Sequence, residues 1–95
     1  AATVSFEELS QCIPDRNTVE TVLEGKELSK VIDAFLDTLT ERERNLFLRR
    51  YWFFDSVKDL ARSFRMSESN VKVTLYRIRK ELKEYLKKEA DIYVG

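Results

Sequence analysis

The chain has 95 residues and a formal net charge of zero; 43% of the residues are hydrophobic and 36% are charged, with two glycines and one proline. This composition is typical of one compact, helix-rich domain, and it excludes a membrane span, because no run approaches the ~18 apolar residues that a span requires. With no histidine, one cysteine and no glycine-rich phosphate loop, the chain has no catalytic or metal-binding constellation, so we expect no enzyme, no metal and no cofactor.

The N-terminal segment, residues 1–17, is predicted to be a linker or tether. Phe6 and Leu9 are isolated apolar residues, and residues 14–17 read Pro-Asp-Arg-Asn, which is a turn sequence. The single cysteine, Cys12, cannot form an internal disulfide. This indicates a reducing compartment, and we predict a cytoplasmic protein.

A first helix is predicted from about Thr18, with Asn17 as its cap. Its apolar residues recur at helical spacing and form one continuous face, made of Leu28, Val31, Ile32, Phe35, Leu36 and Leu39. The helix opens a domain that we place at residues 18–88.

A second helix is predicted from Glu41 to about Phe53. It follows a capping box, in which the Thr40 hydroxyl accepts from the Glu43 amide and the Glu43 side chain reaches back to the Thr40 amide. Within this helix Phe47, Tyr51 and Phe54 share one face, which is most simply a core face.

The second helix is apolar almost all round, apart from Arg49 and Arg50. Two interpretations follow: the helix is buried on several sides, which we favour, or it leaves an apolar surface for a partner. In the second interpretation Leu48 and Trp52, four residues apart, contribute to the partner surface.

Two further helices are predicted around a very short turn. After a cap at Asp55 or Ser56, a short helix carries its apolar residues at Val57, Leu60, Ala61 and Phe64. A longer helix, which we expect Ser67 to cap, carries Val71, Leu75, Ile78, Leu82 and Leu86 on one face. The fold class is therefore an all-α domain of four helices, with a helix-turn-helix at about residues 56–86, no winged elements, and a tail at residues 89–95.

The turn consists of Arg65 and Met66, and Arg65 stands where such turns usually have glycine. A non-glycine residue in the left-handed conformation costs ~1 kcal/mol, which a packed domain can absorb. We therefore expect Arg65 to be left-handed.

Charge is unevenly distributed along the chain. Residues 1–41 have three basic and nine acidic side chains, a balance of −6, and residues 57–88 have ten basic and four acidic ones, a balance of +6. Such a chain suits a protein whose C-terminal half faces an anion. Alternatively, the two halves simply attract each other.

The outward face of the last helix has the chemistry of a major-groove reader. Between Ser69 and Lys80 the helix has four basic residues and no acidic one. Base contacts are predicted from the first turns, which approach base edges: Ser69, Lys72 and Val73, bordered by Glu68 and Asn70. Phosphate contacts are predicted further along, from Tyr76, Arg77 and Lys80. Lys72 can serve a phosphate equally well.

Five stretches follow one another along the chain: Leu-Asp-Thr-Leu-Thr-Glu-Arg-Glu-Arg at 36–44, Arg-Tyr-Trp-Phe at 50–53, Val-Lys-Asp-Leu-Ala-Arg at 57–62, Met-Ser-Glu-Ser-Asn-Val-Lys at 66–72 and Leu-Tyr-Arg-Ile-Arg-Lys-Glu-Leu at 75–82. In this order they resemble the C-terminal DNA-binding domain, region 4, of bacterial RNA polymerase sigma factors of the extracytoplasmic-function type. Two residues depart from the family pattern: Ile78 stands in place of an alanine and Arg65 in place of a glycine.

The resemblance implies recognition of double-stranded promoter DNA at the −35 element, with contacts from Glu68, Ser69, Lys72, Val73 and Arg77. It also implies docking on the β flap of the RNA polymerase core through the helices before the helix-turn-helix. An inhibitory anti-sigma protein would need the same kind of surface. The family's other domain, which opens the promoter, is absent from this sequence, so we expect a fragment or a protein limited to the work of region 4.

Two other functions remain open from the sequence. The first is a stand-alone regulator that binds a palindrome as a dimer. The second is a protein-interaction domain with a vestigial helix-turn-helix, whose acidic N-terminal half masks the basic face.

Overall fold

The computed structural model describes residues 7–10 and 28–94. Within them the chain forms α3 (Leu28–Leu36), α4 (Glu41–Tyr51), α5 (Val57–Phe64) and α6 (Glu68–Val94), with a single helical turn at residues 7–10 and no strand. The all-α prediction with a helix-turn-helix is confirmed. The first turns predicted from Thr18, and most of the predicted linker, lie outside the described residues.

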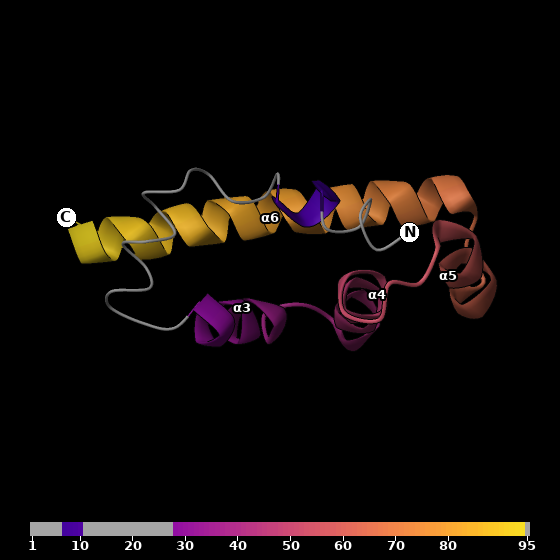
Figure 1. Cartoon of the computed structure of the whole chain (residues 1–95), viewed down its shortest axis with the longest axis horizontal. Coiled ribbons are helices and arrows are strands. Elements are labelled where there is room, and N and C mark those ends of the chain that lie inside the picture. The colour runs from indigo at the N-terminus through magenta and orange to yellow at the C-terminus, as the bar shows by residue number, and fades with distance from the viewer. Residues whose placement is uncertain (1–6, 11–27, 95) are drawn as a thin grey trace.

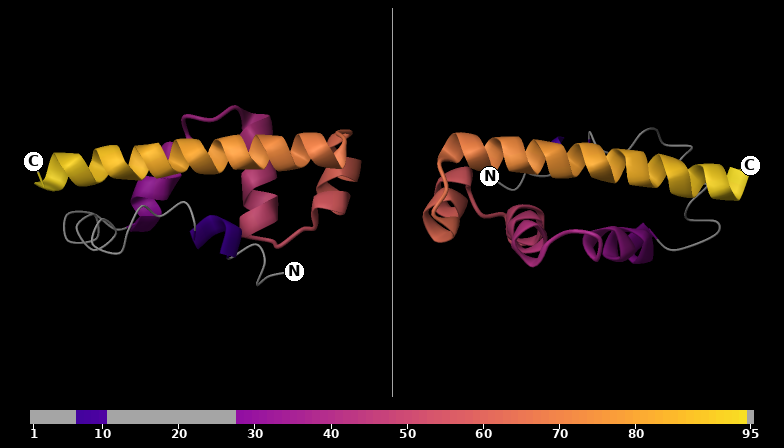
Figure 2. Two further views of the ribbon diagram at one scale, coloured as in Figure 1. Left: turned by 90° about the horizontal axis from the view of Figure 1, so that it is seen from above. Right: turned by 180° about the vertical axis from the view of Figure 1, so that it is seen from behind.

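Helix α6 is the spine of the domain. It runs the length of the molecule, and α3, α4 and α5 lie along one side of it (Figure 1). Seen from above, α4 and α5 cross the direction of α6 steeply (Figure 2). The core lies between these layers and consists of Val31, Phe35, Leu36, Leu46, Phe47, Tyr51, Leu60, Ala61, Val71, Leu75, Ile78, Leu82 and Leu86.

The stripe of α6 that the sequence predicted as core is buried without exception. Val71, Leu75 and Ile78 are no more than 1% exposed, and Leu82 and Leu86 continue the stripe. Burying such side chains stabilises the fold by about 1.5–3 kcal/mol each. The stripe also fixes the rotation of α6 about its axis, and so decides which residues face outward.

Helix α6 is longer than predicted. It continues through the residues assigned to a tail and ends at Val94. The predicted linker likewise contains a helical turn, at residues 7–10.

Helix α4 begins as predicted and ends earlier. The capping box is present: the Glu43 amide donates to Thr40 Oγ1 over 3.2 Å, and the Thr40 amide donates to Glu43 Oε1 over 3.4 Å. The last helical residue is Tyr51, and Phe54 has a positive φ of 60°. The Asp55 amide then donates to the Arg49 carbonyl over 2.9 Å, which fixes the turn out of the helix.

The early end of α4 corrects two expectations. Phe54 was predicted on the core face, but it is 46% exposed because the chain has left the helix before it. Burial of the aromatic run was the favoured interpretation, but Trp52 is 71% exposed, and Phe53 is exposed as well. Only the helical part of the run, represented by Phe47 and Tyr51, is core.

Candidate nucleic-acid interface

The corner between α5 and α6 is a Schellman-type helix end built on a non-glycine residue. Arg65 is left-handed, with φ 55° and ψ 47°, as the sequence predicted. Its amide donates to the Ala61 carbonyl, and the Met66 amide donates to the same carbonyl over 2.9 Å. Both bonds go to the Ala61 carbonyl, one of the groups that a helix end leaves without a partner.

The two helices at this corner are capped by serines, also as predicted. Ser56 Oγ accepts from the Asp59 amide over 3.1 Å, and Ser67 Oγ accepts from the Asn70 amide over 3.1 Å. The guanidinium of Arg42 donates to the Phe64 carbonyl and lies 5.5 Å from the Phe64 ring centroid. Helix α4 therefore helps to stabilise the turn between α5 and α6, which sets the orientation of α6.

The predicted reading residues share the outward side of α6. Ser69 and Lys72 are exposed, and Val73 and Tyr76 are 64% and 60% exposed although both side chains are largely apolar. Glu68, Asn70 and Lys80 are exposed as well. The helix thus presents hydroxyl, ammonium and methyl groups together, which is the set that reads base edges in the major groove. Their individual roles at DNA stay predictions.

Arg77 forms ion pairs with two carboxylates of the protein. It is ion-paired with Glu43 of α4 and, over 3.0 Å, with Glu81 one turn along α6. The hydrogen bond from Arg77 lowers the pKa of Glu43, and the bond to Glu43 raises the pKa of Arg77. The sequence prediction for Arg77 did not foresee this pair, because Glu43 had already been explained as a capping residue.

A second surface lies on the opposite side of α4 from the corner. An apolar groove of about 550 Å³ is lined by Leu9, Ile32, Asp33, Leu36, Phe47, Leu48, Tyr51, Trp52 and Phe53. Leu48 and Trp52, the pair predicted for a partner surface, both line it. Phe53 adds to the exposed aromatic surface and was not predicted, because the helix was expected to continue through it.

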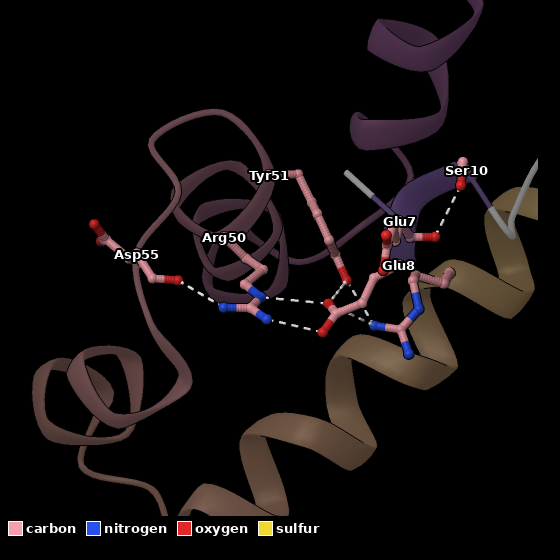
Figure 3. A network of polar contacts seen from close by, with 7 residues as sticks. Glu7, Glu8, Ser10, Arg50, Tyr51 and Asp55 are labelled. Carbon is pink, nitrogen blue, oxygen red and sulfur yellow. Dashed lines mark hydrogen bonds and ion pairs between the residues drawn. The ribbon is translucent and has the colours of Figure 1, made fainter. Parts of the chain in front are cut away.

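A buried ionic network joins the N-terminal turn to α4 and α6 (Figure 3). Glu8 accepts from Arg50 through both carboxylate oxygens, at 2.8 and 3.3 Å, and from the Tyr51 hydroxyl at 3.0 Å. Arg79 donates to the Tyr51 oxygen over 2.6 Å and lies 3.5 Å from Glu8 Oε2. Sequence reasoning missed this network, since Glu8 is 42 or more residues away from each of its partners in the network.

The pKa values in this network follow from burial and charge. Burial alone would raise the pKa of Glu8, but hydrogen bonds from Arg50 and Tyr51, with the charges of Arg50 and Arg79, outweigh it and hold this pKa below the ordinary 4.5. Burial raises the pKa of Tyr51. The carboxylate is therefore ionised and the phenol neutral at physiological pH.

In the described part of the chain, no group of three or more acidic or cysteine side chains is placed to hold a metal ion. Nor does any helix in residues 28–94 combine the length and apolarity that a bilayer crossing needs.

The fold and the outward face of α6 define a helix-turn-helix DNA-binding domain. Residues 29–82, more than half of the chain, match the family model described as Sigma-70, region 4, and the chain belongs to this family. No curated protein and no solved structure matches the chain. The family consists of DNA-binding regulatory domains of transcription initiation that interact with DNA and RNA polymerase, and it is not an enzyme family.

Proposed function

We propose that this domain recognises the −35 element of promoters and docks on the β flap of RNA polymerase, as region 4 of an extracytoplasmic-function-type sigma factor. The observation that carries the proposal is the exposed, acid-free face of α6 between Ser69 and Lys80, set directly after the left-handed corner at Arg65. A corner of this kind presents the first turns of the second helix to the major groove.

In this proposal the first turns of α6 read bases. Lys72 donates to guanine O6 and N7, Val73 packs against a thymine methyl group, and Ser69 bonds to a neighbouring base edge. Glu68, at the border, accepts from cytosine N4. The positive end of the helix dipole supports phosphate binding at the same end.

The following turns hold the backbone of the DNA. Tyr76, Arg77 and Lys80 bind phosphates and set the register without reading sequence. When Arg77 binds a phosphate, its ion pair with Glu43 is replaced by an ion pair with the DNA.

The β flap is proposed to bind the apolar groove at Leu48 and Trp52. Support comes from the groove's lining and from the exposure of Trp52, which is unusual for so large an apolar side chain in the absence of a partner. An anti-sigma protein would compete for the same surface.

Selection from a randomised duplex library tests the DNA half of the proposal. The domain should enrich one motif, and Lys72→Ala should relax specificity at one position and cost about 1–3 kcal/mol in binding free energy. Lys88→Ala is the matched control, because Lys88 is an exposed lysine of the same helix far from the corner. Failure to enrich any motif at low salt, with nonspecific binding still detectable, would refute sequence reading.

The same selection also tests the two alternative functions, a dimeric regulator and a protein-interaction domain. A dimeric regulator would enrich two half-sites related by symmetry and sediment as a dimer. A vestigial helix-turn-helix would not show the DNA binding expected of a functional one, whose affinity falls steeply as the salt concentration rises.

A further inference from the structure

Arg50, Tyr51 and Arg79 together form a receptor for one carboxylate. The Arg50 side chain is almost wholly buried, with 6% of the residue exposed, and its guanidinium grips both oxygens of Glu8. The Tyr51 hydroxyl donates to one of these oxygens, and Arg79 approaches the same oxygen. Charge-assisted hydrogen bonds of this kind are about twice as strong as neutral ones, and the two-bond geometry adds specificity for a carboxylate.

The receptor requires an anion at all times. Arginine does not lose its proton in proteins, and a buried charge without a counter-charge is strongly destabilising. The other acceptor that Arg50 uses is the neutral carbonyl of Asp55, over 3.0 Å. If Glu8 leaves, another carboxylate must therefore take its place or the site must open to water.

The present occupant, Glu8, belongs to the N-terminal helical turn. The N-terminal turn comprises residues 7–10, and its internal side-chain bond is from Ser10 Oγ to the Glu7 carbonyl, over 2.9 Å. The hydrogen bonds from Arg50 and Tyr51 to Glu8 tie this turn to α4.

The receptor adjoins the apolar groove. Tyr51 belongs to both, and Leu9, which follows Glu8, forms one wall of the groove. The resident turn thus shows what the combined surface accepts: a helical segment with a carboxylate followed by an apolar side chain.

We propose that this surface binds an acidic–apolar helical segment of a partner protein, and that the turn at residues 7–10 is an intramolecular ligand which the partner displaces. The inference rests on the proposed docking at the groove and adds the chemistry of the partner and a competing segment of the chain itself. The positive charges of Arg50 and Arg79 favour an acidic segment over a basic one.

A peptide that copies residues 5–11, with blocked ends, tests the proposal. Trp52 is the single tryptophan of the chain and lines the groove, so its fluorescence reports occupancy. The peptide is titrated to millimolar concentration onto the wild-type chain and onto Glu8→Ala, in which the receptor is vacated. We expect saturable binding that is at least tenfold tighter for Glu8→Ala. Should Glu8→Ala lose its helical circular dichroism, Glu8→Gln replaces it.

Matched peptides identify the group that is recognised. A peptide with Gln in place of Glu8 should bind at least tenfold more weakly, whereas one with Gln in place of Glu7 should bind unchanged, because Glu7 is exposed. Equal weakening by both changes, or no saturable signal with a folded variant, overturns the proposal. Inorganic phosphate that binds as tightly as the peptide would overturn the helical partner in favour of a simple anion.

Binding of a β-flap fragment to the same chains separates this inference from the proposed function. A flap that binds both chains while the peptide binds neither overturns only the carboxylate receptor. A peptide that binds while the flap binds neither chain overturns flap docking and upholds the receptor.

Discussion

Arg77 of α6 is ion-paired with Glu43, a residue that also caps the start of α4. The two residues are 34 positions apart in the chain, yet the pair ties the outward side of α6 to the helix that supports the corner. The same guanidinium also contacts Glu81, so two carboxylates compete with any phosphate that approaches it.

Glu43→Gln should therefore strengthen DNA binding. Glutamine keeps the capping box, whereas removal of the charge releases Arg77 for a phosphate. Since exposed pairs are worth little, we expect about a two- to five-fold gain in affinity. The slope of log affinity against log salt should steepen by up to about one. Fluorescence anisotropy over a salt series measures both, with Glu84→Gln as the control. A loss of affinity would instead show that Glu43 positions Arg77 for the DNA.

Arg65→Gly should keep the fold and raise the free energy of unfolding by up to about 1 kcal/mol, because glycine adopts the left-handed conformation without strain. Arg62→Gly is the matched control: Arg62 lies within α5, where glycine costs about 1 kcal/mol. Urea denaturation compares the two variants. Equal losses in both would contradict a left-handed Arg65.

Trp52→Ala should leave stability almost unchanged, within about 0.5 kcal/mol, because the side chain is largely exposed. Its binding to a β-flap fragment should weaken at least tenfold, or about 1.4 kcal/mol. Phe47→Ala, at a buried position of α4, should cost about 3–5 kcal/mol in stability. Loss of helicity in Trp52→Ala would place Trp52 in the core and contradict its role as a docking residue.

Glu8→Gln should destabilise the domain at pH 7 by about 1.5–3 kcal/mol, the range for a hydrogen bond to a charged group. A carboxyl whose pKa is lower in the folded than in the unfolded chain stabilises the fold above its ordinary pKa of 4.5. That stabilisation is lost as the pH falls through the folded value. The difference between wild type and variant should thus be constant from pH 7 to 5 and shrink below 4.5.

Urea denaturation at several pH values measures this difference, and Glu7→Gln serves as the exposed control. A difference that does not change between pH 7 and 3.5 would mean that the charge of Glu8 does not contribute to stability.

The features that sequence predicted are those with local causes. The caps at Thr40, Ser56 and Ser67 depend on residues three positions apart, and the apolar stripe of α6 fixes its outward face by periodicity alone. The corner at Arg65 was predictable because so few residues separate two strong helix patterns.

The features that sequence missed depend on the third dimension or on where a helix stops. Helical spacing placed Phe54 on a core face, but spacing carries no information once the chain leaves the helix after Tyr51. The pairs Glu8–Arg50 and Arg77–Glu43 join segments far apart in the chain, and each residue had an adequate local explanation as a surface charge or a cap.

The continuity of α6 has a mechanical consequence. Helix α6 is unbroken from Glu68 to Val94. One helix therefore contains both the segment proposed to enter the major groove of DNA and the segment against which α3 and α4 pack. A displacement of α3 or α4 therefore cannot reorient the N-terminal end of α6 alone. It must tilt or bend the whole helix. In the proposed function, a protein bound in the apolar groove beside α4 would thereby change the angle at which Lys72 and Val73 meet the DNA.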